Sequence, residues 1–233
     1  MSTASIAVPT ILTTMSVIGG GISGALHATT RKMDITGILF VAICTGVGGG
    51  AVRDVLLGHG VPFFLVHNLV AMAFVGALAG FFFARFVEQL GPAIYTIDTL
   101  LVGFWVVIGA EKALRFGLDP MAAVFLGLTT AVAGGIIRDV LCREIPTALM
   151  PGQWVGASAA LASVSFVLIY ELTSFPVLAE ATAIFMATML RALGARYGWY
   201  TTDAVTMSNQ LRRTLRLTRR RQPEEQTERV SSS

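Results

Sequence analysis

The sequence predicts an all-α integral membrane protein with seven transmembrane helices, arranged as an inverted repeat of three plus three helices followed by a seventh helix. Three observations predict this fold. The 233-residue chain is 54% hydrophobic and only 13% charged, more apolar surface than a soluble domain of this length can bury. The apolar residues gather in segments of about 20, the length that crosses a bilayer. Finally, the residues around Arg53-Asp54 recur around Arg138-Asp139, 85 positions later.

Short connections separate the apolar segments. They are marked in chain order by Arg31-Lys32, Pro62, Gly91-Pro92, Asp119-Pro120, Pro146 with Pro151, and Phe175-Pro176. The predicted helices cover about 6–28, 35–57, 64–86, 93–114, 120–142, 152–171 and 175–197.

One membrane domain is therefore expected over residues 1–204. Repeat 1 covers about 6–86, repeat 2 about 93–171, and the seventh helix about 175–197. The polar, arginine-rich residues 205–233 are expected to form a basic tail without fixed structure.

The register of the repeat predicts its topology. An offset of 85 residues moves the pattern by three spans. Because three is odd, the second copy must cross the membrane in the opposite sense to the first. Lys and Arg are concentrated in the first, third and fifth connections and in the tail. This bias predicts an outside N-terminus and a cytoplasmic C-terminus.

The repeated motif combines glycines with a charged pair inside an apolar span. Gly48, Gly49 and Gly50 precede Arg53-Asp54, and Gly134 and Gly135 precede Arg138-Asp139. Glycine weakens a helix and lets another backbone approach closely, so the second and fifth helices are expected to be kinked there. A rise of 1.5 Å per residue puts Arg53 near the outer end of its span and Arg138 near the inner end of its own.

Two alternatives to a functional motif stay open. The glycines could serve helix packing alone, and the arginines could be anchors that reach the membrane interface. Charges inside spans cost roughly 2.5–3.5 kcal/mol each on insertion scales, so a duplicated pair favours a use. Asp98 lies inside the fourth span, where a wet cavity would suit it, and Lys112 lies near the end of that span.

Several functional classes lack their motifs. The sequence contains no phosphate-binding Gly-x-x-x-x-Gly-Lys-Ser/Thr loop, no Gly-x-Ser-x-Gly and no His-Glu-x-x-His. It also lacks the Thr-Val-Gly-Tyr-Gly carbonyl filter. We therefore expect no enzyme, no cofactor, no metal site and no nucleic-acid partner.

At these residues the chain resembles the prokaryotic trimeric intracellular cation (TRIC) channels. The resemblance covers about residues 12–197 and rests on the Gly-Gly-Gly-x-x-Arg-Asp motif with its degenerate second copy. Arg31-Lys32-Met33-Asp34 and the fourth-span pattern from Asp98 to Leu114 support it. The animal channels carry Lys-Glu-Val where this chain has Arg53-Asp54-Val55, which puts their lipid-linked regulation in doubt here.

The resemblance implies a homotrimer in a prokaryotic plasma (inner) membrane, with an hourglass pore in each protomer lined by the second and fifth helices. It implies passage of potassium and other monovalent cations. Bound lipid is also expected, with anionic headgroups at the arginines of the tail. The pore-lining or gating candidates are Gly48, Gly49, Gly50, Arg53, Asp54, Gly134, Gly135, Arg138 and Asp139, to which the fourth span adds Asp98 and Lys112.

Two other functions stay open at this point. Bacterial relatives of the family are also described as glycine transporters, and an Arg-Asp pair could hold a zwitterion by its carboxylate and its amine. A membrane scaffold without transport is the third hypothesis.

Overall fold

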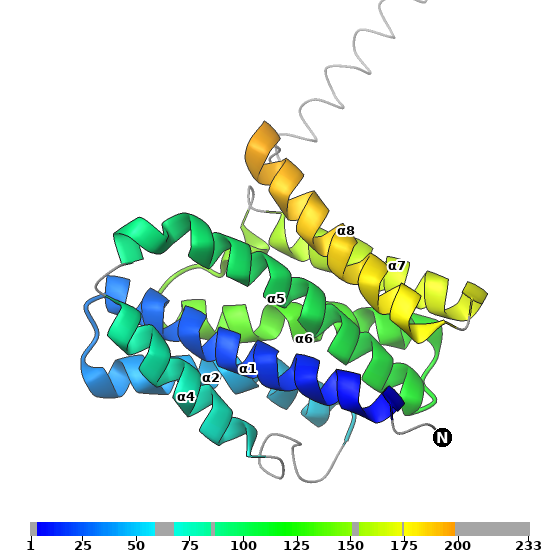
Figure 1. The fold of residues 1–233 in the computed structure, drawn as a ribbon, viewed down its shortest axis with the longest axis horizontal. Helices are drawn as coiled ribbons and strands as arrows, with labels where there is room; N and C mark the ends of the chain where they lie inside the picture. The colour runs from blue at the N-terminus through cyan, green and yellow to red at the C-terminus, as the bar shows by residue number, and fades with distance from the viewer. Residues whose placement is uncertain (1–3, 59–67, 85–86, 151–153, 174, 199–233) are drawn as a thin grey trace, which may run out of the picture.

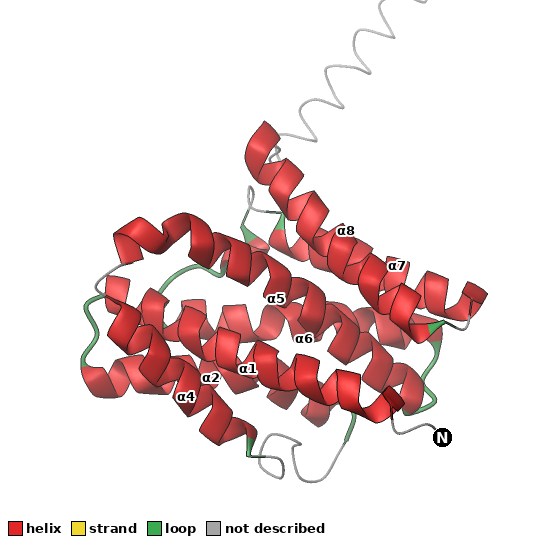
Figure 2. Cartoon of the chain, in the orientation of Figure 1, coloured by secondary structure: helices red, strands yellow, loops and turns green. Residues whose placement is uncertain are grey.

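The computed structural model describes residues 4–58, 68–84, 87–150, 154–173 and 175–198, with only the backbone for 4–10 and 87–94. All regular structure in these ranges is helical (Figure 2). The elements are α1 (Ala4–Thr30), α2 (Ile35–Leu56), α4 (Leu69–Phe83), α5 (Val87–Arg115), α6 (Pro120–Leu141), the short 3₁₀ helix η2 (Thr147–Leu149), α7 (Val155–Thr173) and α8 (Pro176–Tyr197).

The described helices confirm the predicted all-α membrane fold. Five segments are long and apolar enough to cross a membrane: Ile11–Thr30, Ile35–Leu56, Pro120–Leu141, Val155–Thr173 and Pro176–Tyr197. The 15 described residues of α4 form a shorter apolar helix. The 29-residue α5 carries Asp98, Glu111 and Lys112.

In Figure 1, α1, α5 and α6 run through the middle of the bundle. On one side α2 and α4 pack against α1 and each other, and on the other side α7 and α8 pack against α6 and α5. The core between these layers includes Val106 and Phe166, both without exposed surface. Close glycine contacts draw the helices together: a Cβ on Gly20 would lie 2.9 Å from the Cα of Gly46.

The predicted second and fifth spans are α2 and α6, and they begin and end alike. The carboxylate of Asp34 accepts a hydrogen bond from Gly37 N at 2.9 Å, and that of Asp119 accepts one from Ala122 N at 2.8 Å. Such N-caps satisfy backbone donors that a helix start leaves open. At the other ends, the N–H groups of Leu57 and Cys142 bond to the carbonyls of Arg53 and Arg138.

The contacts between α2 and α6 are reciprocal. A Cβ on Gly134 would lie 2.8 Å from the carbonyl oxygen of Thr45, and one on Gly49 would clash with the carbonyl oxygen of Thr130. Thr45 and Gly49 occupy the same repeat positions as Thr130 and Gly134. Because residue 45 meets 134 and residue 49 meets 130, the two helices cross in opposite directions about a local two-fold relation.

The structure differs from the sequence expectation at the start of the fourth span. The helix α5 begins at Val87, so Gly91-Pro92 lies inside a helix and not in a connection. Proline in the second turn costs one backbone hydrogen bond, which a 29-residue helix can tolerate. The helices α2 and α6 continue through their glycines.

Some expectations stay predictions. The basic tail lies outside the described residues. The kinks in α2 and α6, the inversion of the whole repeats and the sidedness of the termini stay predictions as well.

Candidate functional site

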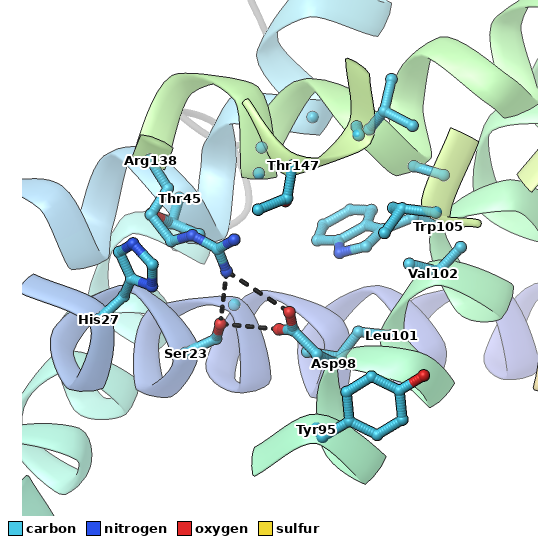
Figure 3. A pocket seen from close by; sticks show the side chains of 18 of the residues that line it. Ser23, His27, Thr45, Tyr95, Asp98, Leu101, Val102, Trp105, Arg138 and Thr147 are labelled. Atoms are coloured by element: carbon cyan, nitrogen blue, oxygen red, sulfur yellow. Dashed lines mark hydrogen bonds and ion pairs between the residues drawn. The ribbon is translucent and has the colours of Figure 1, made fainter. Parts of the chain in front are cut away.

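A cavity of about 340 Å³ lies in the core of the bundle, between α1, α2, α5, α6 and α8. Its polar lining comes mainly from α1 and α5, with Arg138 projecting from α6 (Figure 3). The side chains that matter below are Ser23, His27, Tyr95, Asp98, Trp105, Arg138 and Arg191. Among the lining residues, all of which belong to the described part of the chain, Asp98 is the only carboxylate.

Arg138 joins three helices at this cavity. Its Nη1 donates to Ser23 Oγ at 2.9 Å and lies 3.5 Å from Asp98 Oδ2. Ser23 Oγ in turn donates to Asp98 Oδ1 at 2.7 Å. Figure 3 shows the three side chains pointing toward one another. The Arg138 side chain therefore reaches α1 and α5 from α6, across 115 residues of sequence to Ser23.

Asp139 holds the other edge of the Arg138 guanidinium. Arg138 Nε donates to Asp139 Oδ1 at 2.9 Å. Asp139 Oδ2 accepts from the backbone N and the Oγ1 of Thr147, at 2.8 and 3.0 Å. The aspartate has no exposed surface, so its charge depends on these partners.

A second charged group adjoins this network. Glu144 pairs with Arg31 and lies 2.7 Å from His27 Nε2. The ligand atoms of His27, Asp139 and Glu144 fall within 4.8 Å of one another, although their sequence spacing gives no metal signature. Arg31 pairs with Glu144 and Arg138 pairs with Asp139. Both carboxylates of the group therefore have a positive partner, so we describe the group as an ion-pair network.

The first copy of the motif forms a separate cluster near the end of α5. Arg53 Nε donates to Asp54 Oδ1 at 2.8 Å, and Lys112 Nζ donates to the same oxygen at 2.7 Å. Arg53 and Asp54 are buried, with 3% and 0% exposure. Lys112 occupies the repeat position of His27. The first helix of each half therefore places a basic side chain beside the motif of the other half, Lys112 at Asp54 and His27 near Asp139.

The structure divides the sequence-predicted residues into two groups. Gly49, Gly134, Gly135, Asp98 and Arg138 line the cavity, and Asp139 braces Arg138 from behind. The lining does not include Gly48, Gly50, Arg53, Asp54 or Lys112.

Sequence reasoning missed several lining residues. Ser23 has no charge and no motif, and only its contact with Arg138 reveals it. Thr45 and Thr130 did carry a signal, because they occupy the same repeat position. Each now lines the cavity and bonds to the carbonyl four residues earlier, at 2.6 Å.

Sequence comparison places these features in a known family. A profile described as Glycine transporter matches residues 10–85 and again residues 95–171. The chain belongs to this Glycine transporter family. The two matched ranges fall on the two halves that the sequence repeat marks.

Relatives of this chain are membrane proteins. A UPF0126 membrane protein of Deinococcus radiodurans is 31% identical over 183 residues, which are 78% of this chain and 85% of that protein. The inner membrane protein YadS of Escherichia coli K12 is 39% identical over 131 residues, 55% of this chain and 63% of YadS. Together with the apolar helices, these relatives support an inner membrane location.

Solved structures confirm the resemblance to the prokaryotic TRIC channels. The TRIC trimeric intracellular cation channel orthologue from Rhodobacter sphaeroides aligns with a TM-score of 0.77 and 31% identity, covering 82% of this chain and 99% of that one. A second solved structure, reported as a structural basis for conductance through TRIC cation channels, aligns with a TM-score of 0.76 and 28% identity. The alignment covers 83% of this chain and 95% of that one.

Proposed function

We propose that this protein is a potassium-permeable, monovalent cation channel whose hourglass pore lies inside each protomer of a homotrimer and is lined by α2 and α6. The likeness to TRIC cation channels over more than four fifths of the chain supports a cation channel. Membership of a channel and transporter family also points away from an enzyme.

One observation in the chain itself carries the proposal: Arg138 lies between two carboxylates. An arginine beside a cation path would repel potassium unless its charge were neutralised. Asp139 lies 2.9 Å from Arg138 and Asp98 lies 3.5 Å from it. These three side chains sum to one negative charge, and Asp98 keeps 31% of its side chain exposed. Taken by itself, this group favours a cation beside Asp98, although the cavity wall also carries the cationic Arg191.

The glycine crossing gives the path a narrow point. Gly49 and Gly134 bring α2 and α6 into backbone contact next to the cavity. Beyond this crossing lies the buried Arg53–Asp54–Lys112 cluster. In the proposed channel, the arginines act as gating elements that exchange carboxylate partners, and the α2–α6 crossing forms the waist of the hourglass.

The deciding experiment is single-channel recording from purified protein in planar bilayers under a potassium chloride gradient. Discrete current steps that reverse near the potassium equilibrium potential are expected. Currents that reverse near the chloride potential, or a silent bilayer, would contradict a cation channel.

A glycine transporter is the second candidate, and the description of the matching family profile favours it. The cavity offers Arg138 for a carboxylate and Asp98 for an amine. Uptake of labelled glycine into liposomes, together with silent bilayers, would support the carrier. Uptake that is absent while current steps persist would support the channel.

We also propose contacts between membrane lipids and this chain, with anionic headgroups at the arginine-rich tail. The tail contains Arg212, Arg213, Arg216 and Arg219 to Arg221, and anionic headgroups attract such basic segments. Flotation with phosphatidylglycerol liposomes, compared between the full chain and a chain ending at residue 204, would measure this contribution.

A further inference from the structure

A buried arginine that neither repeat contains lies at the edge of the cavity. Arg191 projects from α8, has 3% exposure and lines the cavity together with Asp98 and Arg138. Its guanidinium carbon lies 5.2 Å from the centre of the Tyr95 ring. Tyr95 is three residues before Asp98, so these two side chains lie on one face of α5.

Arg191 has no carboxylate partner in the described part of the chain. None of the ion pairs formed by described residues includes Arg191, and its Nε has no hydrogen-bond acceptor there. Asp98, the carboxylate of this cavity, is already engaged by Ser23 and Arg138. An aromatic ring compensates a buried cation only partly. A buried charge without a counter-ion is strongly unfavourable.

The backbone holds Arg191 in this position. A Cβ on Gly103 of α5 would lie 2.9 Å from the Cα of Ile184, two turns before Arg191 on α8. The hydroxyl of Tyr95 donates to the backbone carbonyl of Arg191 at 3.0 Å. The backbone of Arg191 is thus held beside the cavity by a close helix crossing and a hydrogen bond.

We propose that Arg191 is an anion-binding residue, and that the cavity accepts a small oxyanion such as a carboxylate at its guanidinium. A planar guanidinium matches the two oxygens of a carboxylate or phosphate. The volume of about 340 Å³ suits a molecule of a few heavy atoms. Bound there, the anion supplies the counter-charge that the described residues lack and partly fills the cavity of the proposed cation path.

The test measures binding at equilibrium and so does not depend on whether the protein conducts cations. Purified, delipidated protein in an uncharged detergent is titrated with sodium acetate, and with sodium chloride at the same ionic strength. Thermal unfolding and tryptophan fluorescence are followed, because Trp105 lines the cavity. Acetate is expected to raise the Tm and change the fluorescence beyond the effect of chloride.

Variants assign the effect to Arg191. Arg191→Met should weaken acetate binding at least about tenfold, the effect of losing a charge-assisted hydrogen bond. Its Tm without acetate should equal or exceed that of the wild type, since an unpaired charge is removed. Arg196→Met is the matched control, because Arg196 is exposed on the same helix; it should bind acetate like the wild type.

The source of the oxyanion is separated by a second titration with phosphatidylglycerol. A Tm increase with acetate indicates a free carboxylate, and an increase with phosphatidylglycerol alone indicates a lipid headgroup; either effect must be lost in Arg191→Met. The proposal is overturned if neither compound shifts the wild type, or if Arg191→Met retains the shift. It is also overturned if Arg191→Met alone is strongly destabilised, because Arg191 would then have an internal partner.

Discussion

At the scale of single residues, the cavity depends on how Arg138 is shared between two aspartates of different exposure. Asp139 is fully buried and bonded through both oxygens. Asp98 is partly exposed to the cavity and bonded to Ser23. We interpret Asp139 as the structural brace of Arg138 and Asp98 as the group that a permeating ion would meet.

Asp98→Asn should therefore lower potassium conductance while leaving the protein folded. The variant keeps the shape of the side chain and removes the negative charge that attracts cations into the cavity. We expect single-channel conductance in planar bilayers to fall roughly twofold or more. Glu171→Gln removes an exposed carboxylate at the end of α7 and serves as control. Equal conductance of Asp98→Asn and the control would place Asp98 outside the path.

Asp139→Asn should mainly affect stability. Removing one partner of a buried ion pair leaves an uncompensated charge and costs about 3–5 kcal/mol. Unfolding in detergent should show a loss of this size, and Arg138→Met in the same chain should recover part of it. If the two losses simply add in the double variant, the Arg138–Asp139 bond contributes no coupling.

At the scale of elements, the two glycine runs are not uniform, although their sequence makes them look so. A Cβ on Gly134 would press on the Thr45 carbonyl at 2.8 Å, while one on Gly135 would have no atom within 4 Å. On α2, Gly49 is similarly blocked by Thr130, while a Cβ on Gly50 would be 3.7 Å from its nearest neighbour, Arg53. Gly49 and Gly134 therefore make the backbone contact of the helix crossing. A Cβ on Gly48 would lie 2.8 Å from the Ile137 side chain, whereas Gly50 and Gly135 do not pack against the partner helix.

Alanine substitutions should separate these roles. Gly49→Ala and Gly134→Ala overpack the crossing and should each destabilise the protein by about 1–3 kcal/mol. Gly50→Ala and Gly135→Ala should be neutral or stabilising by about 0.5–1 kcal/mol, because alanine favours a helix. Unfolding in detergent measures all four. Equal effects within each pair would mean that α2 and α6 do not pack through Gly49 and Gly134.

Element boundaries followed the sequence where a local signal marks them. The predicted spans 35–57 and 120–142 match Ile35–Leu56 and Pro120–Leu141, since Asp34 and Asp119 cap the helix starts. Gly91-Pro92 was a misleading signal for a helix boundary, because the long α5 continues through it.

Among the site residues, the adjacent Arg-Asp pairs were predictable from the sequence. Ser23 and Arg191 were not, because they reach the cavity only through packing between distant helices.

At the scale of the whole molecule, the duplication explains why the site is both paired and unequal. Each half supplies a capped helix, a glycine contact and an Arg-Asp pair. The surroundings have diverged: Arg138 meets Ser23 and Asp98, whereas Asp54 binds Lys112. Local geometry is thus kept by the repeat, while the charges around it differ between the two ends of the bundle.

The described glycines of the helix interiors mostly pack within the protomer. Gly20 meets α2, Gly76 meets α1 and Gly103 meets α8. Small residues are the usual contact between helices in lipid. The proposed trimer would therefore need contacts from larger exposed side chains, such as Phe82 and Phe185 at 70% and 62% exposure.

If each protomer contains its own pore, the trimer should conduct in three equal steps. Native mass spectrometry should give three chains of 24.7 kDa, about 74 kDa. Recordings should then show three equally spaced conductance levels. In trimers with one Asp98→Asn subunit, two of the three conductance steps should be unchanged and one should be smaller, because the change affects only the cavity of its own protomer. A single shared pore would instead give one level that shifts as a whole.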